Sequence, residues 1–224
     1  MKGKIINLEK ISPFYLFSLE DYLLSNINEF YVIFYSFPPC VILGRSSKVE
    51  DEVFVENIIQ DNITIARRQS GGGVVYITPD QLCVSFLFPK EIKLPEDLKE
   101  KYTFLASITA KSLSDFGDFT FDERGNIFSM DGGKISGCSG YLNKHGYLHH
   151  FTIIRKPIKN MEKYLKKIKY KTSFINVPKE KLKKAITKGL KDYFSITFKE
   201  FLIDSIDLSN ILSKYKDKNY IFRL

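Results

Sequence analysis

Apolar residues recur at helical spacing in several segments of the chain, and each such segment predicts an amphipathic helix. The segment 18–27 places leucines on one face, with Ser18 before them as a helix N-cap. The segment 95–117 carries the longest apolar stripe and predicts the longest helix. Three further helices are expected: a short one over 49–62, a basic one over 159–169, and one over 178–194.

Short runs of β-branched and aromatic residues lie between these helices and predict strands. Two of them flank a turn at Pro38 and Pro39, and residues 196–224 are expected to add a strand, a short helix and a terminal strand. The other predicted strands cover 31–35, 40–44, 63–67, 74–78, 82–88, 119–122, 126–130, 134–137 and 146–154. Strands cluster without regular alternation with helices, so we predict an α+β fold with a mixed or antiparallel sheet flanked by helices. We expect one domain over 1–224, with 196–224 as its short C-terminal extension.

The composition narrows the class of protein. Hydrophobic residues make up 44% of the 224 residues, which is ample for a packed core. No apolar run reaches the length that a bilayer requires, so no membrane association is expected, and the N-terminus does not resemble a signal peptide. Cys40, Cys83 and Cys138 have no metal-like spacing, and their odd number disfavours a disulfide framework. A cytoplasmic location is the simplest expectation.

The net charge of +8 suits an acidic or polyanionic partner. The excess lysines are concentrated after residue 154, away from the glycine-rich segments described next. A solvated helix face is the favoured reading of these lysines, with a binding patch for an acidic partner as the competing one. No nucleic-acid partner is expected.

The segment 65–78, IARRQSGGGVVYIT, combines arginines, a serine and three consecutive glycines directly before a predicted strand. Glycine-rich loops allow backbone N–H groups to approach an anion closely, and arginine binds phosphate or carboxylate through two parallel hydrogen bonds. The spacing matches neither a P-loop nor a dinucleotide-binding fingerprint, because no Gly-Lys-Ser/Thr follows and the next element is a strand. The segment therefore predicts an anion-binding loop of another kind.

A second glycine cluster, GNIFSMDGGKISGCSGY, places Lys134 beside glycines as a compact positive charge. The third feature is GYLHHFTI, in which His149 and His150 are adjacent in one predicted strand. Neighbouring side chains of a strand point to opposite faces of the sheet. A metal site that uses both histidines is therefore disfavoured, and no metal ligands are predicted.

Taken together, PPCVILGRSS, ARRQSGGGVVY, KISGCSGY and HHFTI resemble, in order and approximate spacing, the lipoate–protein ligases of the biotin/lipoate ligase superfamily. The resemblance extends from FSLEDYLL to about Phe194. It implies a catalytic domain related to the cores of class II aminoacyl-tRNA synthetases. It also implies that ATP and Mg²⁺ are used to convert lipoate into lipoyl-AMP. The lipoyl group then passes to a lysine of an acceptor protein, such as an E2 lipoyl domain or the glycine cleavage H protein.

The resemblance also implies roles for individual residues. Lys134 would be catalytic and would contact the carboxylate and the α-phosphate. Val75 and Tyr76 would meet the adenine through their backbone, and His150 would lie beside the acyl chain. The other residues expected to bind the lipoyl or adenylate group are Arg68, Ser70, Gly71, Gly72, Gly73, Asn126, Ser136 and Gly137.

The chain departs from the family pattern in ways that keep alternatives open. RGNIF lacks the aspartate of the family's R-N-D-L stretch, and HHF replaces its H-H-G. Only thirty residues follow Phe194, where bacterial ligases carry an accessory domain, so we expect either a separate accessory subunit or reduced adenylation. The alternatives are an octanoyl or lipoyl transferase of the same fold and a non-catalytic module that binds acyl groups, nucleotides or nucleic acid. Transferases use a cysteine nucleophile, but Cys138, the only cysteine in the site region, does not stand where they place it, and a buried inert thiol is its favoured reading. A biotin ligase is disfavoured because the chain has no tryptophan.

Overall fold

The computed structural model describes residues 2–203 and 206–223, and its main element is an eight-stranded sheet. The strand order is β11-β1-β2-β6-β10-β9-β8-β7. Strand β1 runs parallel to both of its neighbours and the other pairs are antiparallel, so the predicted mixed sheet is confirmed. In chain order the strands are β1 (Lys2–Leu8), β2 (Phe30–Tyr35), β6 (Leu82–Pro89), β7 (Phe119–Phe121), β8 (Ile127–Ser129), β9 (Lys134–Leu142), β10 (Gly146–Ile153) and β11 (Thr197–Glu200).

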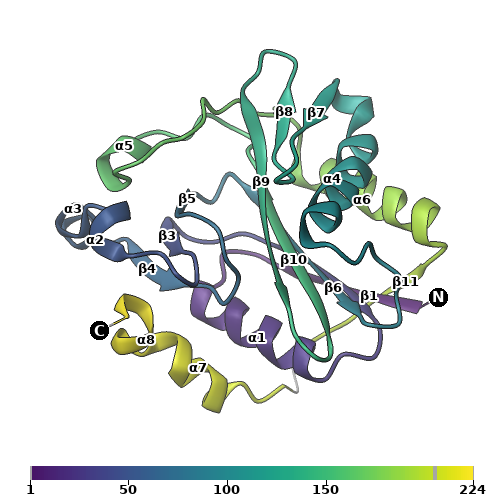
Figure 1. Ribbon diagram of the computed structural model, residues 1–224, viewed down its shortest axis with the longest axis horizontal. Helices are drawn as coiled ribbons and strands as arrows, with labels where there is room; N and C mark the ends of the chain where they lie inside the picture. The colour runs from purple at the N-terminus through teal and green to yellow at the C-terminus, as the bar shows by residue number, and fades with distance from the viewer. Residues whose placement is uncertain (1, 204–205, 224) are drawn as a thin grey trace.

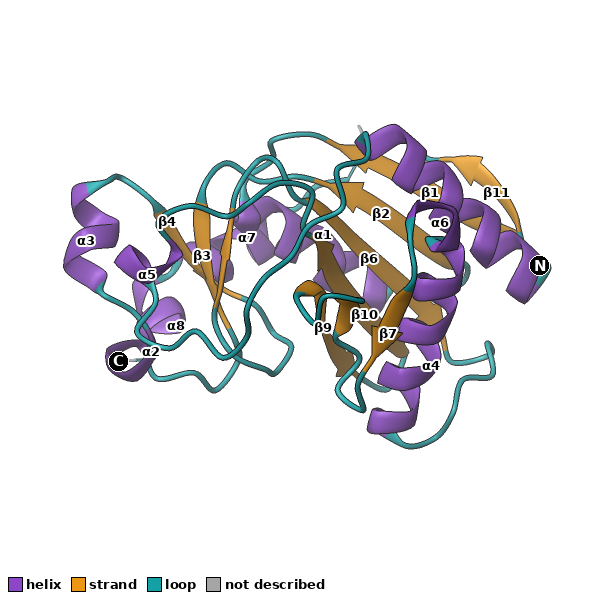
Figure 2. Cartoon of the chain, turned by 90° about the horizontal axis from the view of Figure 1, so that it is seen from above, coloured by secondary structure: helices purple, strands orange, loops and turns teal. Residues whose placement is uncertain are grey.

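A second sheet of three strands, in the order β4-β3-β5, lies beside the first. Its strands are β3 (Cys40–Leu43), β4 (Thr64–Arg67) and β5 (Val75–Ile77). The strands expected on either side of Pro38 and Pro39 both form, but this turn carries the chain from one sheet into the other. Figure 2 shows the small sheet, with short helices around it, at the end of the molecule opposite α4 and α6.

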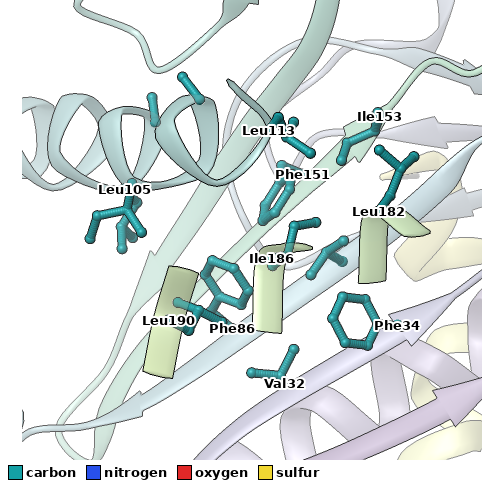
Figure 3. Packing of buried hydrophobic residues seen from close by; sticks show 14 of the residues in the cluster. Val32, Phe34, Phe86, Leu105, Leu113, Phe151, Ile153, Leu182, Ile186 and Leu190 are labelled. Atoms are coloured by element: carbon teal, nitrogen blue, oxygen red, sulfur yellow. The ribbon is translucent and has the colours of Figure 1, made fainter. Parts of the chain in front are cut away.

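Helices cover both faces of the large sheet (Figure 1). Helices α1 (Pro13–Ser25) and α7 (Ser209–Lys216) share one hydrophobic cluster with the sheet, and α4 (Leu98–Ser112) and α6 (Lys179–Phe194) share another. In the second cluster, leucines and an isoleucine from the two helices pack against Phe86 and Phe151 (Figure 3). The α+β fold with helices on both sides of the sheet is therefore as predicted. No helix in the described ranges is long and apolar enough to cross a membrane.

Several helix predictions were wrong in their limits. Helix α1 starts at Pro13 after Ser12, and Ser18 is buried within it, where its hydroxyl donates to the Phe14 carbonyl. The helix expected over 49–62 is two short helices, α2 (Val49–Glu52) and α3 (Val55–Gln60). The segment 95–117 forms α4 and a 3₁₀ turn (Ser114–Phe116), and α4 has 15 residues against 16 in α6, so α4 is not the longest.

Two predicted elements differ more strongly from the structure. The basic helix over 159–169 shrinks to α5 (Met161–Tyr164), because the chain after it pairs with other segments: Leu165 bridges to Val53, and Thr172 bridges to Lys134. The expected terminal strand is instead α8 (Lys218–Phe222), which Asp217 caps through its side chain. The extension 196–224 thus contributes β11 to the large sheet and two helices elsewhere. The one-domain assignment stays a prediction.

Candidate active site

The glycine loop, residues 68–74, joins β4 to β5 and turns its carbonyl groups inward. Arg68 Nη2 donates to the carbonyls of Gly71 and Gly73 at 2.6 and 2.8 Å, and Ser139 Oγ donates to Gly71 at 2.7 Å. Gly72 has a φ of +85°, a left-handed conformation that glycine adopts without strain. Among the described residues, the N–H groups of Gly71, Gly72 and Gly73 have no hydrogen-bond partner. The loop therefore presents free donors, as an anion site requires.

Arg68 organises this loop from within. Its side chain is only 6% exposed, and its hydrogen bonds go to uncharged groups, Ser70 Oγ and the carbonyls of Ile42, Gly71 and Gly73. Burial lowers the pKa of its guanidinium to about 10, so it stays protonated at neutral pH. In this conformation Arg68 contributes positive charge behind the loop, and its donors hold the loop backbone.

Ser70 continues into a buried chain of polar groups. Its Oγ lies 2.6 Å from His150 Nε2, and His150 Nδ1 lies 3.5 Å from Glu20 Oε1, which also accepts a hydrogen bond from Ser85. Glu20 lies in α1 and is 1% exposed. The chain fixes His150, from the centre of the large sheet, against the start of the glycine loop.

His149 lies on the other face, as the alternation predicted. Its ring packs among aromatic rings that include Phe86, Tyr147 and Phe151. Complete burial, with a smaller effect of the neighbouring His150, lowers the pKa of His149 to about 3, so this imidazole stays neutral. The two histidines therefore belong to different environments. No group of three or more His, Cys, Asp or Glu in the described part of the chain could hold a metal ion.

Lys134 begins β9, and its ammonium lies above Gly137 of the same strand. A Cβ built on Gly137 would lie 2.6 Å from Lys134 Nζ, so an alanine there would displace the end of the lysine side chain from this position. The ring of Tyr170 stacks on the same ammonium, with its centroid 4.7 Å from Nζ. Burial lowers the pKa of Lys134, and the nearby Cys138 and Asp122 oppose that shift. The lysine is thus half-buried, with its ammonium between the Tyr170 ring and Gly137.

Asn126 lies close to Lys134 and is fixed by Asp122, a residue that the sequence analysis missed. Asp122 accepts from the backbone N–H of Asn126 at 2.9 Å and from its side-chain amide at 2.8 Å. The Asn126 Oδ1 atom would lie 3.5 Å from a Cβ on Gly137. The tight turn at Gly125, with a φ of +72°, brings Asp122 back to Asn126. A carboxylate four residues before the expected asparagine, with a glycine between, was the available signal.

Strand β9 brings the glycine loop and Lys134 together. Gly137 lies under the lysine and Ser139 holds the loop, and residues two apart in a strand point to the same face. The predicted residues that the structure brings together on this face are Arg68, Ser70, Gly71, Gly72, Gly73, Asn126, Lys134, Gly137 and His150.

Three of the predicted site residues have no recorded side-chain contact with this group. Val75 in β5 is 38% exposed, and the ring of Tyr76 packs on Tyr164 with centroids 4.8 Å apart. The backbone role that the resemblance implies for these two residues stays a prediction. Ser136 is buried, and its Oγ has no hydrogen-bond partner in the part of the chain that the structure describes.

Cys138 and Arg67 complete the surroundings of the site. Burial raises the pKa of the Cys138 thiol to about 12, and Sγ lies 3.3 Å from the Arg124 carbonyl, so the thiol is protonated at neutral pH. Arg67 is fully buried, and its guanidinium donates to Ile221 in α8 and to the carbonyls of Gly44 and Ser47. The sequence analysis gave Arg67 no separate role, because two adjacent arginines look alike until strand β4 points them to opposite sides.

Comparisons with known proteins point to one family. Residues 12–204 match the family model of the lipoyl protein ligase A/B catalytic domain. A probable lipoate-protein ligase A from Mycoplasma pneumoniae is 30% identical over 158 residues, which cover 69% of this chain and 46% of the relative. The lipoate-protein ligase LplJ of Bacillus subtilis is 25% identical over 84% of this chain and 54% of its own. The chain thus spans about half the length of these curated relatives. A shorter match, 36% identical over 34% of this chain and 19% of the relative, is to the inactive lipoate–protein ligase 2 of Plasmodium falciparum.

Solved structures show the same fold. A putative lipoate protein ligase from Thermoplasma acidophilum with bound lipoic acid has a TM-score of 0.85 and covers 99% of this chain and 100% of its own. A lipoate-protein ligase A bound with ATP has a TM-score of 0.88 and covers 100% of both chains. Each is 19% identical, so these matches establish the fold alone. On the strength of the family match over residues 12–204, the chain belongs to the lipoyl protein ligase A/B catalytic-domain family.

Proposed function

We propose that the chain is the catalytic part of a lipoate–protein ligase, which activates lipoate with ATP and transfers the lipoyl group to a lysine of an acceptor protein. One observation carries the proposal: the glycine loop, held by Ser139 through the Gly71 carbonyl, and the half-buried ammonium of Lys134 lie over the same face of β9. Relatives crystallised with lipoic acid and with ATP support this choice of substrates.

The first step joins two anions. The lipoate carboxylate attacks the α-phosphate of ATP, the bond to the β-phosphate breaks, and lipoyl-AMP and pyrophosphate form. Positive charge and oriented donors are needed where negative charge accumulates, and they act most strongly in a site with little water. Lys134 supplies the charge, and Gly71, Gly72 and Gly73 supply the donors. The Tyr170 ring limits where the lysine can move.

The second step transfers the acyl group. The acceptor amine attacks the carbonyl of lipoyl-AMP, the bond to the phosphate oxygen breaks, and AMP leaves. Charge develops on the carbonyl oxygen, and Lys134 is placed to stabilise it as well. His150, held by Glu20 and Ser70, forms part of the wall beside the acyl chain.

Magnesium suits the residues present. Mg²⁺ in nucleotide sites is held by one or two carboxylates together with phosphates and water. Asp122 and the Oδ1 atom of Asn126 would hold it, and the metal would supply neutralisation of phosphate charge. The fit rests on one carboxylate beside an amide oxygen, both near Lys134.

The proposed acceptors are lipoyl domains of E2 subunits and the glycine cleavage H protein, encountered in the cytoplasm. A bipartite archaeal ligase, described together with its E2 lipoyl domain from Thermoplasma acidophilum, is 19% identical and shares this fold. Its description supports lipoyl domains as acceptors, and it supports a separate accessory subunit for this chain.

The decisive experiment is lipoate-dependent ATP–pyrophosphate exchange, followed by transfer to a purified lipoyl domain. Lys134→Gln should abolish exchange, and Lys167→Gln, which removes the same charge at an exposed position, should retain it. The runner-up is an acyl transferase that takes octanoyl or lipoyl groups from a carrier protein. Acyl transfer from a carrier protein without ATP would establish the transferase instead, provided that no ATP–pyrophosphate exchange occurs with or without the accessory subunit.

A further inference from the structure

A cationic groove lies between the loop of residues 44–50 and the C-terminal helices, next to the glycine loop, whose Gln69 lines part of it. It consists of two adjoining cavities of about 540 and 190 Å³, and Arg45 and Arg223 line both of them. Lys48 adds to the larger cavity and Lys214 to the smaller. Neither cavity is lined by Lys134, Asn126 or the three loop glycines.

The positive charges of this groove lack counterions. Arg45, Lys48 and Arg223 make no ion pair with a carboxylate anywhere in residues 2–203 and 206–223, and only Lys214 has one, with Asp21 at 2.9 Å. A single acid, Glu50, lines the larger cavity. The groove therefore holds three unneutralised cations that converge on one space.

Beneath these cations, a buried arginine adds a fourth positive charge. Arg67 donates through Nη1 to the carbonyls of Gly44, Arg45 and Ser47, which form the wall of the groove. Its side chain is fully buried and has no carboxylate partner among the described residues. An uncompensated buried charge is costly, and an anion nearby would offset part of that cost.

Two buried donors at the groove have no acceptor in the described part of the chain. They are the Arg67 Nη2 atom and the Gln69 Nε2 atom, and Gln69, which is 9% exposed, lines the smaller cavity. Buried polar groups are nearly always hydrogen-bonded, so each of these donors calls for an acceptor, a water or a ligand. Gln69 faces the smaller cavity, whereas Arg67 lies behind the wall of the groove. A ligand that accepts from amide and guanidinium groups and carries negative charge satisfies both observations.

We propose that this groove is a binding site for a phosphate-class oxyanion, either free or at the end of a nucleotide's phosphate chain. Arg45 and Arg223 form the two sides of the site, and their planar guanidinium groups each match two phosphate oxygens. The ring of Tyr220, 5.3 Å from the Arg223 guanidinium carbon, supports that side chain from behind. The site does not depend on the proposed ligase activity.

Calorimetric titration with pyrophosphate and orthophosphate tests the site, at an ionic strength held constant with KCl. We expect saturable binding, and a loss of affinity of about tenfold or more in Arg45→Gln and in Arg223→Gln, since each removes a bidentate contact. Lys216→Gln, the same loss of charge on an exposed part of α7, should bind like the wild type. Lys134→Gln should also bind like the wild type, which separates this groove from the active site.

Two further arms complete the test. Lys48→Gln changes an exposed side chain of the larger cavity and keeps the proposal testable if loss of Arg223 loosens α8. Competition by ATP in the Lys134→Gln protein assigns the anion to a nucleotide tail, and lack of competition assigns it to a free phosphate; both support the site. The proposal is overturned if binding does not saturate, if Lys216→Gln weakens it as much as Arg45→Gln, or if it disappears in Lys134→Gln.

Discussion

Alanine substitutions at Gly71, Gly72 and Gly73 separate the folding role of the glycine loop from its role in binding. A Cβ on Gly71 or Gly73 would meet no atom within 4 Å, and neither residue has a positive φ. Alanine at such a position reduces the entropy of the unfolded chain and stabilises a protein by about 0.4–1 kcal/mol. We therefore expect Gly71→Ala and Gly73→Ala to be slightly more stable than the wild type.

Gly72 should behave in the opposite way. Its φ of +85° costs an alanine about 1–2 kcal/mol, and the new Cβ would lie 3.1 Å from Arg68 Nη2. The gain from the unfolded chain is the same in both variants, so the stability of Gly72→Ala should fall below that of Gly71→Ala by about 1–2 kcal/mol, the left-handed cost alone. At roughly 2–4 °C per kcal/mol for a chain of this size, the difference in melting temperature is several degrees.

Activity should not follow stability. A methyl group on Gly71 or Gly73 occupies the space through which the loop N–H groups reach a phosphate, so lipoate-dependent ATP–pyrophosphate exchange should drop about 10²-fold, as for loss of a catalytic donor. Urea unfolding followed by circular dichroism measures the stability. Gly117→Ala, with a φ of +144° far from the loop, is the control that loses stability without losing exchange. Full exchange in Gly71→Ala and Gly73→Ala would refute the assignment of the loop as the anion site.

Three other substitutions give independent checks. Burial lowers the pKa of Lys134 below its ordinary 10.5, so the folded chain disfavours the ammonium form. Lys134→Met should therefore have a larger free energy of unfolding than the wild type at pH 7, and the difference should narrow as the pH rises towards 10.5. A difference that does not change with pH in urea titrations would contradict this. Tyr170→Leu removes a ring contact worth about 0.5–2 kcal/mol and should lower kcat/KM about 2- to 30-fold. Tyr170→Phe keeps the ring and should retain activity. Equal losses of kcat/KM in both variants would exclude a role for the ring. Cys138→Ser should keep ATP-dependent ligation, because the pKa of about 12 leaves the thiol protonated. If this variant loses acyl transfer and the wild type shows no ATP–pyrophosphate exchange, the transferase is favoured instead.

The sequence predicted the scaffold well where local pattern and tertiary packing agree. Strands β6 and β10 and helix α6 have apolar positions at regular spacing, and they form close to the expected limits. The segment 159–169 failed because its lysine-rich pattern favours a helix while the chain is held by distant partners. The Lys134 N–H donates to the Lys171 carbonyl at 2.8 Å, and Ser173 N–H donates back to Lys134 at 3.0 Å. Pairing across the molecule overrides local propensity here.

The sequence indicated candidate residues for the site, but it did not indicate where their side chains point. The glycines and Lys134 stood out as clusters in the sequence, and the family resemblance was needed to give them and Asn126 roles in a site. The direction of the Arg68 side chain could not be found, because it depends on carbonyls that the folded loop turns toward it. Asp122 was missed for a similar reason, since its contact with Asn126 exists only once Gly125 has made its turn.

The adjacent arginines of β4 connect helix α8 to the glycine loop through hydrogen bonds. Arg68 holds the glycine loop, while Arg67 holds the last turn of α8 through the Ile221 carbonyl at 2.7 Å. Release of α8 would leave a buried guanidinium without that acceptor and would loosen the strand that anchors the loop. Amide hydrogens in α8 and those at the end of β4 should therefore exchange with solvent as one cooperative unit. A tag fused after residue 224 that loosens α8 should also speed up amide exchange in the glycine loop.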